Sequence, residues 1–191
     1  MNKLIPTIIG MLIGGCMALY AGNLPVNIAH RGACGYLPEH TLPAKALAYG
    51  MQADFIEQDV VLTRDDRALV IHDIHLDTVT DVAEKFPGRA RADGRYYALD
   101  FTLAEIKTLN ACERFNIASG TAVFAGRFPL WKSDFRLHTL EEEIEMIQGL
   151  NKSSGRNVGL YPEIKDPAWH RAQGRDISPV VIKILADYGY T

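Results

Sequence analysis

Residues 55–73 read FIEQDVVLTRDDRALVIHD, and this stretch decides the fold that the sequence predicts. Two apolar runs rich in β-branched residues flank a short polar segment, which is typical of a strand, a turn and a second strand. A two-residue turn at Asp65-Asp66 makes the stretch an antiparallel hairpin. Counting back from that turn predicts that His72 lies opposite Asp59.

The first strand of this hairpin carries two acids, Glu57 and Asp59, two positions apart. Side chains of a strand repeat every second residue, so both carboxylates point to the same face. Two carboxylates with the His72 imidazole nearby are typical of a site for a hard metal ion with an acid or base beside it. The alternative is a solvated strand face, because polar alternation is ordinary on a half-exposed strand.

Composition narrows the class of protein. The chain has 191 residues, and its hydrophobic content of 48% is enough for one globular core. The net charge of −3 comes from residues of mixed sign and gives no reason to expect a nucleic acid or an anionic membrane as partner.

The first 22 residues differ from the rest. A short basic start precedes an apolar run, which is typical of a secretory signal peptide and too short for a good membrane span. Ile13-Gly14-Gly15-Cys16 resembles a bacterial lipobox, in which Cys16 is lipidated and becomes the new N-terminus. Cleavage after Ala18, which releases a soluble protein, is the alternative. Both place the protein outside the cytoplasm.

The remaining cysteines are Cys34 and Cys112. An oxidising compartment permits a disulfide between them, but the sequence does not fix the distance between their Cα atoms. We favour two free, buried thiols.

The first repeating unit is a strand followed by a helix. Residues 26–30 are apolar and end at His30, and Arg31 follows at once. Thr41 caps a helix predicted over 42–49. The carboxyl end of a strand is where α/β folds carry chemistry, and an arginine binds phosphate with two parallel hydrogen bonds. His30 and Arg31 are therefore candidate site residues, although a lone histidine is more often structural.

The later elements follow the same alternation. The pattern predicts an irregular insertion over 74–136 with a short helix at 103–109, a helix over 140–150, a strand over 158–161, a polar loop over 166–176, and a helix over 180–188 capped at Ser178. The strand runs on to Glu163 and Lys165, whose side chains share a face. Strands alternating with helices predict a parallel sheet. A closed eight-stranded barrel needs about 250 residues, so we expect only its N-terminal part here.

Five motifs in this order resemble the glycerophosphodiester phosphodiesterase family, especially its secreted bacterial branch. The motifs are His30-Arg31-Gly32, GYLPEHT at 35–41, IEQDV at 56–60, Ile71-His72-Asp73 and Pro162-Glu163-Ile164-Lys165. The resemblance runs from about Ile28 to the end of the chain. It implies an α/β TIM (β/α)₈ barrel of the phospholipase C-like phosphodiesterase type, with a small insertion after the second strand.

The resemblance also implies roles for individual residues. Glu57, Asp59 and Glu163 would bind a divalent cation, and His30 and His72 would be the general acid and base. Arg31 would contact phosphate, with Lys165 as a further contact. Three carboxylates suit Ca²⁺ or Mg²⁺, and we expect Ca²⁺ in an extracellular compartment. His75 and His138 are expected on the surface or behind the site, and His170 in a solvated loop.

The activity so implied is hydrolysis of glycerophosphodiesters, such as glycerophosphocholine and glycerophosphoethanolamine, to sn-glycerol 3-phosphate and an alcohol. The only expected partner is this small substrate, with membrane contact through a lipid anchor at Cys16. The expected domains are a signal peptide at 1–22 and part of a barrel at 23–191. Related lipid phosphodiester substrates are one alternative. A non-catalytic surface lipoprotein, or an inactive truncated fragment, is another.

Overall fold

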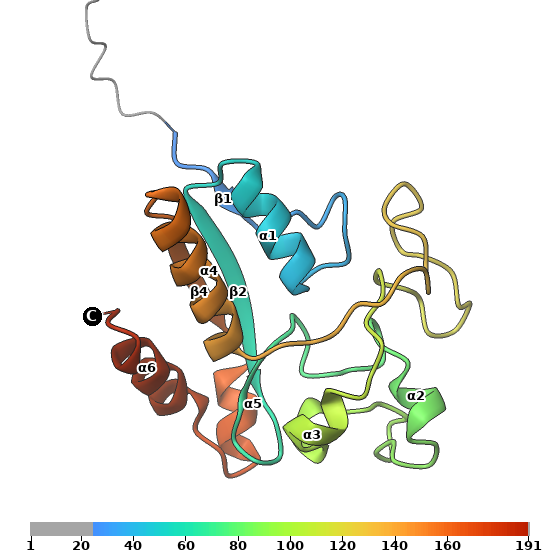
Figure 1. Ribbon diagram of the computed structural model, residues 1–191. Helices are drawn as coiled ribbons and strands as arrows, with labels where there is room; N and C mark the ends of the chain where they lie inside the picture. The colour runs from blue at the N-terminus through green and yellow to red at the C-terminus, as the bar shows by residue number, and fades with distance from the viewer. Residues whose placement is uncertain (1–24, 191) are drawn as a thin grey trace, which may run out of the picture.

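Strand β2 (Phe55–Leu62) is the central strand in the computed structural model, which describes residues 25–190 (Figure 1). Parallel strands β1 (Ile28–Ala29) and β4 (Gly159–Ile164) both pair with it, in a register that sets Asp59 beside Glu163. The predicted parallel sheet is therefore confirmed. The signal peptide, the lipobox and Cys16 lie outside the described residues. No helix within 25–190 is long and apolar enough to cross a membrane.

The hairpin of β2 with β3 (Ala68–Val70) is confirmed, but its predicted register is wrong by one residue. The loop closes with the Thr63 amide donating to Arg67 O at 3.0 Å, so it has three residues rather than two. Its last residue, Asp66, takes the left-handed conformation with φ 57°, as is common in three-residue hairpin loops. Consequently Ile71, not His72, pairs with Asp59, through an amide-to-carbonyl hydrogen bond of 3.0 Å.

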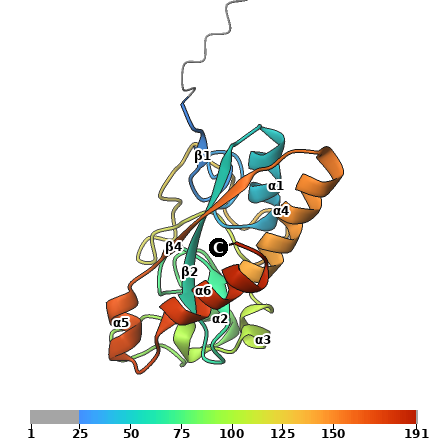
Figure 2. The ribbon, with the colours of Figure 1, turned by 90° about the vertical axis from the view of Figure 1, so that its left-hand side faces the viewer.

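Helices α1 (Leu42–Gly50) and α4 (Leu140–Ser154) pack on the same side of the sheet (Figure 2). Thr41 caps α1 as predicted, with its hydroxyl accepting from Ala44 N. Helix α4 starts at the predicted capping box, in which Thr139 and Glu142 each bond the other's backbone amide. It ends one turn later than predicted, where Gly155 adopts the left-handed φ of 72° that glycine tolerates best.

The C-terminal part differs from the prediction in two ways. The predicted polar loop over 166–176 contains helix α5 (Pro167–Ala172), which starts with proline in its first turn. Helix α6 (Ile177–Asp187) begins earlier than predicted, because Asp176 rather than Ser178 is the cap. The Asp176 carboxylate accepts a hydrogen bond from Ser178 N at 3.2 Å.

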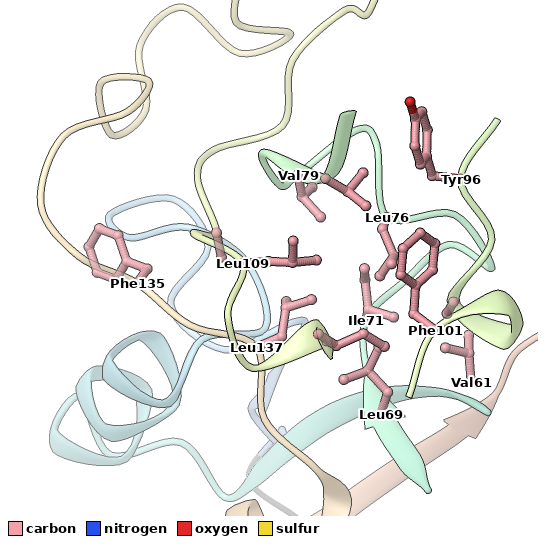
Figure 3. Packing of buried hydrophobic residues seen from close by; sticks show 14 residues of the cluster. Val61, Leu69, Ile71, Leu76, Val79, Tyr96, Phe101, Leu109, Phe135 and Leu137 are labelled. Carbon is pink, nitrogen blue, oxygen red and sulfur yellow. The ribbon is translucent and has the colours of Figure 1, made fainter. Parts of the chain in front are cut away.

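The segment after the hairpin packs against the hairpin through buried hydrophobic side chains (Figure 3). It contains helix α2 (Val82–Lys85), the 3₁₀ helix η1 (Ala98–Asp100) and helix α3 (Leu103–Ile106), which is shorter than predicted. Its buried side chains join those of the hairpin in one cluster. The cluster includes Val61, Leu69, Ile71, Leu76, Val79, Phe101, Leu109, Phe135 and Leu137. This packing fixes the segment onto β2 and β3.

Candidate active site

The centre of the site is the pair of acids on β2. Ligand atoms of Glu57, Asp59 and His40 lie within 4.8 Å of one another, and all three residues are buried. The predicted proximity of Glu57 and Asp59 is thus confirmed. The sequence did not single out His40 as a site residue, because the irregular loop that carries it has no periodic pattern from which its position follows.

Asp59 sits among positive or hydrogen-donating groups. His40 Nε2 lies 2.8 Å from Asp59 Oδ2, Arg31 Nε lies 3.7 Å from the same oxygen, and Lys165 Nζ lies 3.5 Å from Oδ1. Burial opposes ionisation, but the hydrogen bond with His40 and the nearby Lys165 charge hold the pKa of Asp59 below its usual range. An ionised Asp59 can only accept, so His40 Nε2 carries the shared proton and His40 orients Asp59.

Glu57 is held differently. Its Oε2 accepts a hydrogen bond of 2.5 Å from the Arg31 amide, whereas its Oε1 is buried and has no hydrogen-bond partner within residues 25–190. Burial, together with the nearby Asp59 charge, raises the pKa of Glu57 to about 7. Asp59 Oδ1 is likewise buried, without a hydrogen bond from the described part of the chain. Two buried carboxylate oxygens of this kind fit a divalent cation, which takes oxygen ligands.

Strand β4 brings Glu163 and Lys165 to the same region. Glu163 pairs with Asp59 across the sheet, but its side chain is 53% exposed and accepts a 2.6 Å hydrogen bond from Lys165 Nζ. The Lys165 ammonium therefore contacts both Glu163 and Asp59. The structure thus brings Glu163 next to the buried pair without making it part of the cluster with His40.

His30 and Arg31 follow β1 and lie at the rim. Both line a cavity of about 140 Å³, together with Cys34, Phe124 and Arg127. Phe124 and Arg127 come from the insertion, and the sequence did not identify them. Arg31 is a non-glycine residue with φ 59°, directly after His30. Strain of this kind is characteristic of functional sites.

Gly32 continues this turn with φ 79°, and it is packed against α1. A Cβ at this position would approach the backbone carbonyl carbon of Ala44 to 3.0 Å. Only glycine combines this conformation with so close a contact. The turn therefore fixes where the Arg31 backbone amide meets Glu57.

His72 lies beyond β3 and is bonded to its neighbour. Its Nδ1 is 2.5 Å from Asp73 Oδ1. Burial opposes ionisation of Asp73, but hydrogen bonds from His72 and Arg114 keep its pKa below the usual range. An ionised carboxylate only accepts, so Nδ1 of His72 carries the proton and Nε2 is left for a reacting group.

The other histidines are mostly structural. His170 is fully buried and accepts from Leu62 N at 3.1 Å, so the expectation of a solvated loop is wrong. His138 is also buried, with Nε2 2.8 Å from Glu143, and is not a surface residue. Cys34 and Cys112 are free, as favoured from the sequence, but only Cys112 is buried, whereas Cys34 is partly exposed. Burial raises the pKa of the Cys112 thiol to about 12.

Comparisons with known proteins show the family of the chain. The model of the glycerophosphoryl diester phosphodiesterase family matches residues 30–190. A glycerophosphodiester phosphodiesterase of Haemophilus influenzae is 58% identical over 167 residues, covering 86% of this chain and 46% of the relative. One of Treponema pallidum is 45% identical over 181 residues, covering 94% and 49%. The chain thus spans about half the length of the curated relatives it matches.

Solved structures give the same result. An Oleispira antarctica phosphodiesterase, determined in complex with the product sn-glycerol-3-phosphate, superposes with a TM-score of 0.59 at 25% identity. The alignment covers 86% of this chain and 53% of that one. From its motifs, its parallel β1, β2 and β4, and these matches, the chain belongs to the glycerophosphoryl diester phosphodiesterase family and forms part of that family's TIM barrel.

Proposed function

We propose that the protein hydrolyses glycerophosphodiesters with the help of a divalent cation. Either water or the neighbouring glycerol hydroxyl adds to phosphorus, and the ester bond to the head-group alcohol breaks. In the second case water then opens the cyclic phosphate, so the products of both routes are sn-glycerol 3-phosphate and that alcohol. The observation that carries the proposal is the buried pair of Glu57 and Asp59, each of which has an oxygen that accepts no hydrogen bond within residues 25–190. Arg31 Nε lies 3.7 Å from the other oxygen of Asp59, and the chain belongs to the family. The Oleispira relative bound to sn-glycerol-3-phosphate supports the product.

Glu57 and Asp59 would hold the cation, and Glu163 would join them from the adjacent strand. When bound, the cation supplies positive charge against the phosphodiester and the charge that develops on it. We propose Ca²⁺, with Mg²⁺ as the alternative, since both prefer oxygen ligands. Arg31 and Lys165 would bind phosphate oxygens, because both lie beside Asp59, Arg31 near Oδ2 and Lys165 near Oδ1.

Two histidines would move the protons. His30 lines the rim cavity with Arg31, and His72 has its Nε2 left for a reacting group by the Asp73 bond. One removes a proton from the attacking oxygen and the other protonates the leaving alkoxide. Each transfer is worth roughly 10²–10⁴-fold in rate. Either histidine can take either role in this geometry.

The substrates we propose are head-group diesters such as glycerophosphocholine and glycerophosphoethanolamine. The basic start and apolar run of residues 1–22 support a site of action in the periplasm or on the cell envelope. Cys16 would then anchor the protein by a lipid. Incorporation of labelled palmitate into the protein, lost in Cys16→Ala, tests the anchor.

The test of the activity is release of glycerol 3-phosphate from glycerophosphocholine, first with Ca²⁺ and then with excess chelator. We expect chelator to abolish release, and His72→Ala or His30→Ala to reduce it by roughly 10²–10⁴-fold. His75→Ala is the matched control, because the His75 ring packs on Tyr97, with centroids 4.4 Å apart, and has no role in the proposed reaction, so this variant should keep near-normal activity. Release that persists in chelator and in both variants would contradict the proposal. No release in any condition would favour the non-catalytic alternative.

A further inference from the structure

We propose that Arg114, in the insertion, is a positioning residue that holds both His72 and Arg31 in their working orientations. The inference rests on the proposed function, in which these two side chains act on the phosphodiester. Arg114 reaches neither directly. It acts through one carboxylate on each side, Asp73 and Glu39.

The guanidinium of Arg114 hydrogen-bonds two segments that are distant from each other in sequence. One terminal nitrogen, Nη1, donates to Asp73 Oδ2 at 2.5 Å, and the other, Nη2, donates to Glu39 Oε1 at 2.6 Å. The Arg114 side chain is 16% exposed and that of Glu39 is 2% exposed. Hydrogen bonds between charged groups are stronger than neutral ones, and the planar fork fixes both partners at once.

The first branch ends at His72. The two carboxylate oxygens of Asp73 have different partners: Oδ1 binds His72 Nδ1 at 2.5 Å, and Oδ2 binds Arg114. Thr78 Oγ1 adds a 3.1 Å bond to Oδ2. With Oδ2 fixed, the carboxylate cannot rotate away from the imidazole. A carboxylate held in this way fixes both the ring orientation and the tautomer of its histidine.

The second branch ends at Arg31. Glu39 accepts from Nη1 of Arg31 at 3.3 Å on Oε1 and at 3.2 Å on Oε2. Its Oε1 is also the oxygen that binds Arg114. Glu39 therefore orients the guanidinium that we assign to phosphate, and Arg114 holds Glu39. A single arginine thus links the proposed proton-transfer group to the proposed phosphate ligand.

If Arg114 only stabilised the fold, its replacement would leave the tautomer of His72 and the rate of glycerol 3-phosphate release unchanged. The chain offers a matched control variant for this alternative. Arg95 also lies in the insertion and forms a two-point ion pair with Asp77, at 2.9 Å and 2.7 Å. Asp77 is 4% exposed, so its carboxylate is sheltered like that of Glu39, while the Arg95 side chain is 32% exposed. In the contacts of residues 25–190, it touches neither His72 nor Arg31.

The experiment compares Arg114→Met and Arg114→Lys with Arg95→Met. Nitrogen-15 chemical shifts of the imidazoles report which nitrogen of His72 carries the proton, with the signal assigned by its loss in His72→Gln. We expect the neutral Nδ1–H form to dominate in the wild type and in Arg95→Met. In Arg114→Met this preference is lost. Arg114→Lys keeps the positive charge, but an ammonium cannot bind Asp73 and Glu39 with two fixed nitrogens. We therefore expect it to restore the Nδ1–H form of His72 only in part.

Kinetics give a second readout. Loss of a group that orients another typically costs 10–100-fold, so we expect glycerol 3-phosphate release to fall about 10–100-fold in Arg114→Met. We also expect the KM for glycerophosphocholine to rise in this variant, because Glu39 no longer holds Arg31, the proposed phosphate ligand, in place. A wild-type tautomer in both Arg114 variants, or an equal change in Arg95→Met, overturns the inference. If the wild type releases no product, the proposed function fails, and the tautomer still decides the positioning role. If Arg114→Met does not fold, Arg114→Lys decides.

Discussion

Strand β2 has buried polar groups on both faces, and the two faces differ in how those groups are satisfied. On one face Glu57 and Asp59 each keep a buried oxygen that no residue within 25–190 hydrogen-bonds. On the other, Gln58 donates at 2.9 Å to Glu143 Oε1, which also lies 3.3 Å from the Lys45 ammonium. His138 Nε2 lies 2.8 Å from the second oxygen of Glu143.

Both Glu143 oxygens are therefore contacted by Lys45, Gln58 and His138, and the Glu143 carboxylate is a paired charge in the core. A buried charge is tolerated when it is paired in this way. Glu57 Oε1 and Asp59 Oδ1 accept no hydrogen bond within residues 25–190, although Lys165 Nζ lies 3.5 Å from Asp59 Oδ1, and buried oxygens of this kind fit a ligand. We therefore expect the Glu143 cluster to stabilise the fold and the Glu57 and Asp59 pair to bind a ligand.

Removing Lys45 should have the largest effect on stability. Lys45 is fully buried, and its ammonium also donates to the backbone oxygen of Glu57. Lys45→Met leaves Glu143 without its ammonium partner and should lower the free energy of unfolding by about 3–5 kcal/mol. Urea unfolding measures this. The double variant Lys45→Met/Glu143→Gln should recover part of the loss, and a Lys45→Met protein as stable as the wild type would contradict a structural role for the cluster.

The same cluster predicts a pH dependence. Although burial opposes it, the Lys45 charge and the His138 hydrogen bond lower the pKa of Glu143 from 4.5 to about 2. A carboxyl with a lowered folded-state pKa stabilises the protein above its unfolded pKa, and this contribution disappears as pH falls through the folded value. The stability gap between wild type and Glu143→Gln should therefore be full above about pH 5 and shrink from there toward pH 2. Urea unfolding at several pH values measures the gap, and a gap that stays constant over this range would rule out the assignment.

Glu57→Gln should have the smallest effect on stability. The glutamine oxygen can still accept from the Arg31 amide, and the buried oxygen that lacks a partner within residues 25–190 is replaced by a neutral group. We expect a change below about 1 kcal/mol, in either direction, in chelator-treated protein. Thermal unfolding of Glu57→Gln and Glu143→Gln under the same conditions measures the change in stability of each. A loss as large as that of Glu143→Gln would remove the distinction between the two faces.

One face of β2 was easier to predict from the sequence than the other. Period-2 alternation was enough to bring Glu57 and Asp59 together, because it depends only on strand geometry. The partners of those acids come from other segments. His40 lies in an irregular loop, and Lys45 was one residue of an apparently apolar helix, so only tertiary packing shows that both are buried.

The turn shows a second limit of the sequence. Asp65-Asp66 suited a two-residue turn, and the left-handed conformation of Asp66 instead belongs to a three-residue loop. One residue of loop length shifts the pairing by one position. The approximate place of His72 was predicted, but its fixing through Asp73 and Arg114 depends on an insertion that has no regular sequence pattern.

The most direct test of the central claim is a calorimetric titration of Ca²⁺ into chelator-treated wild type, Glu57→Gln and Glu143→Gln at pH 7. If the face of β2 that carries Glu57 and Asp59 is the cation site, wild type and Glu143→Gln bind Ca²⁺ with similar affinity, within about threefold. Glu57→Gln then binds at least about tenfold more weakly, because a carboxylate ligand is lost. Equal binding by Glu57→Gln and wild type, or equal weakening in both variants, would contradict the claim.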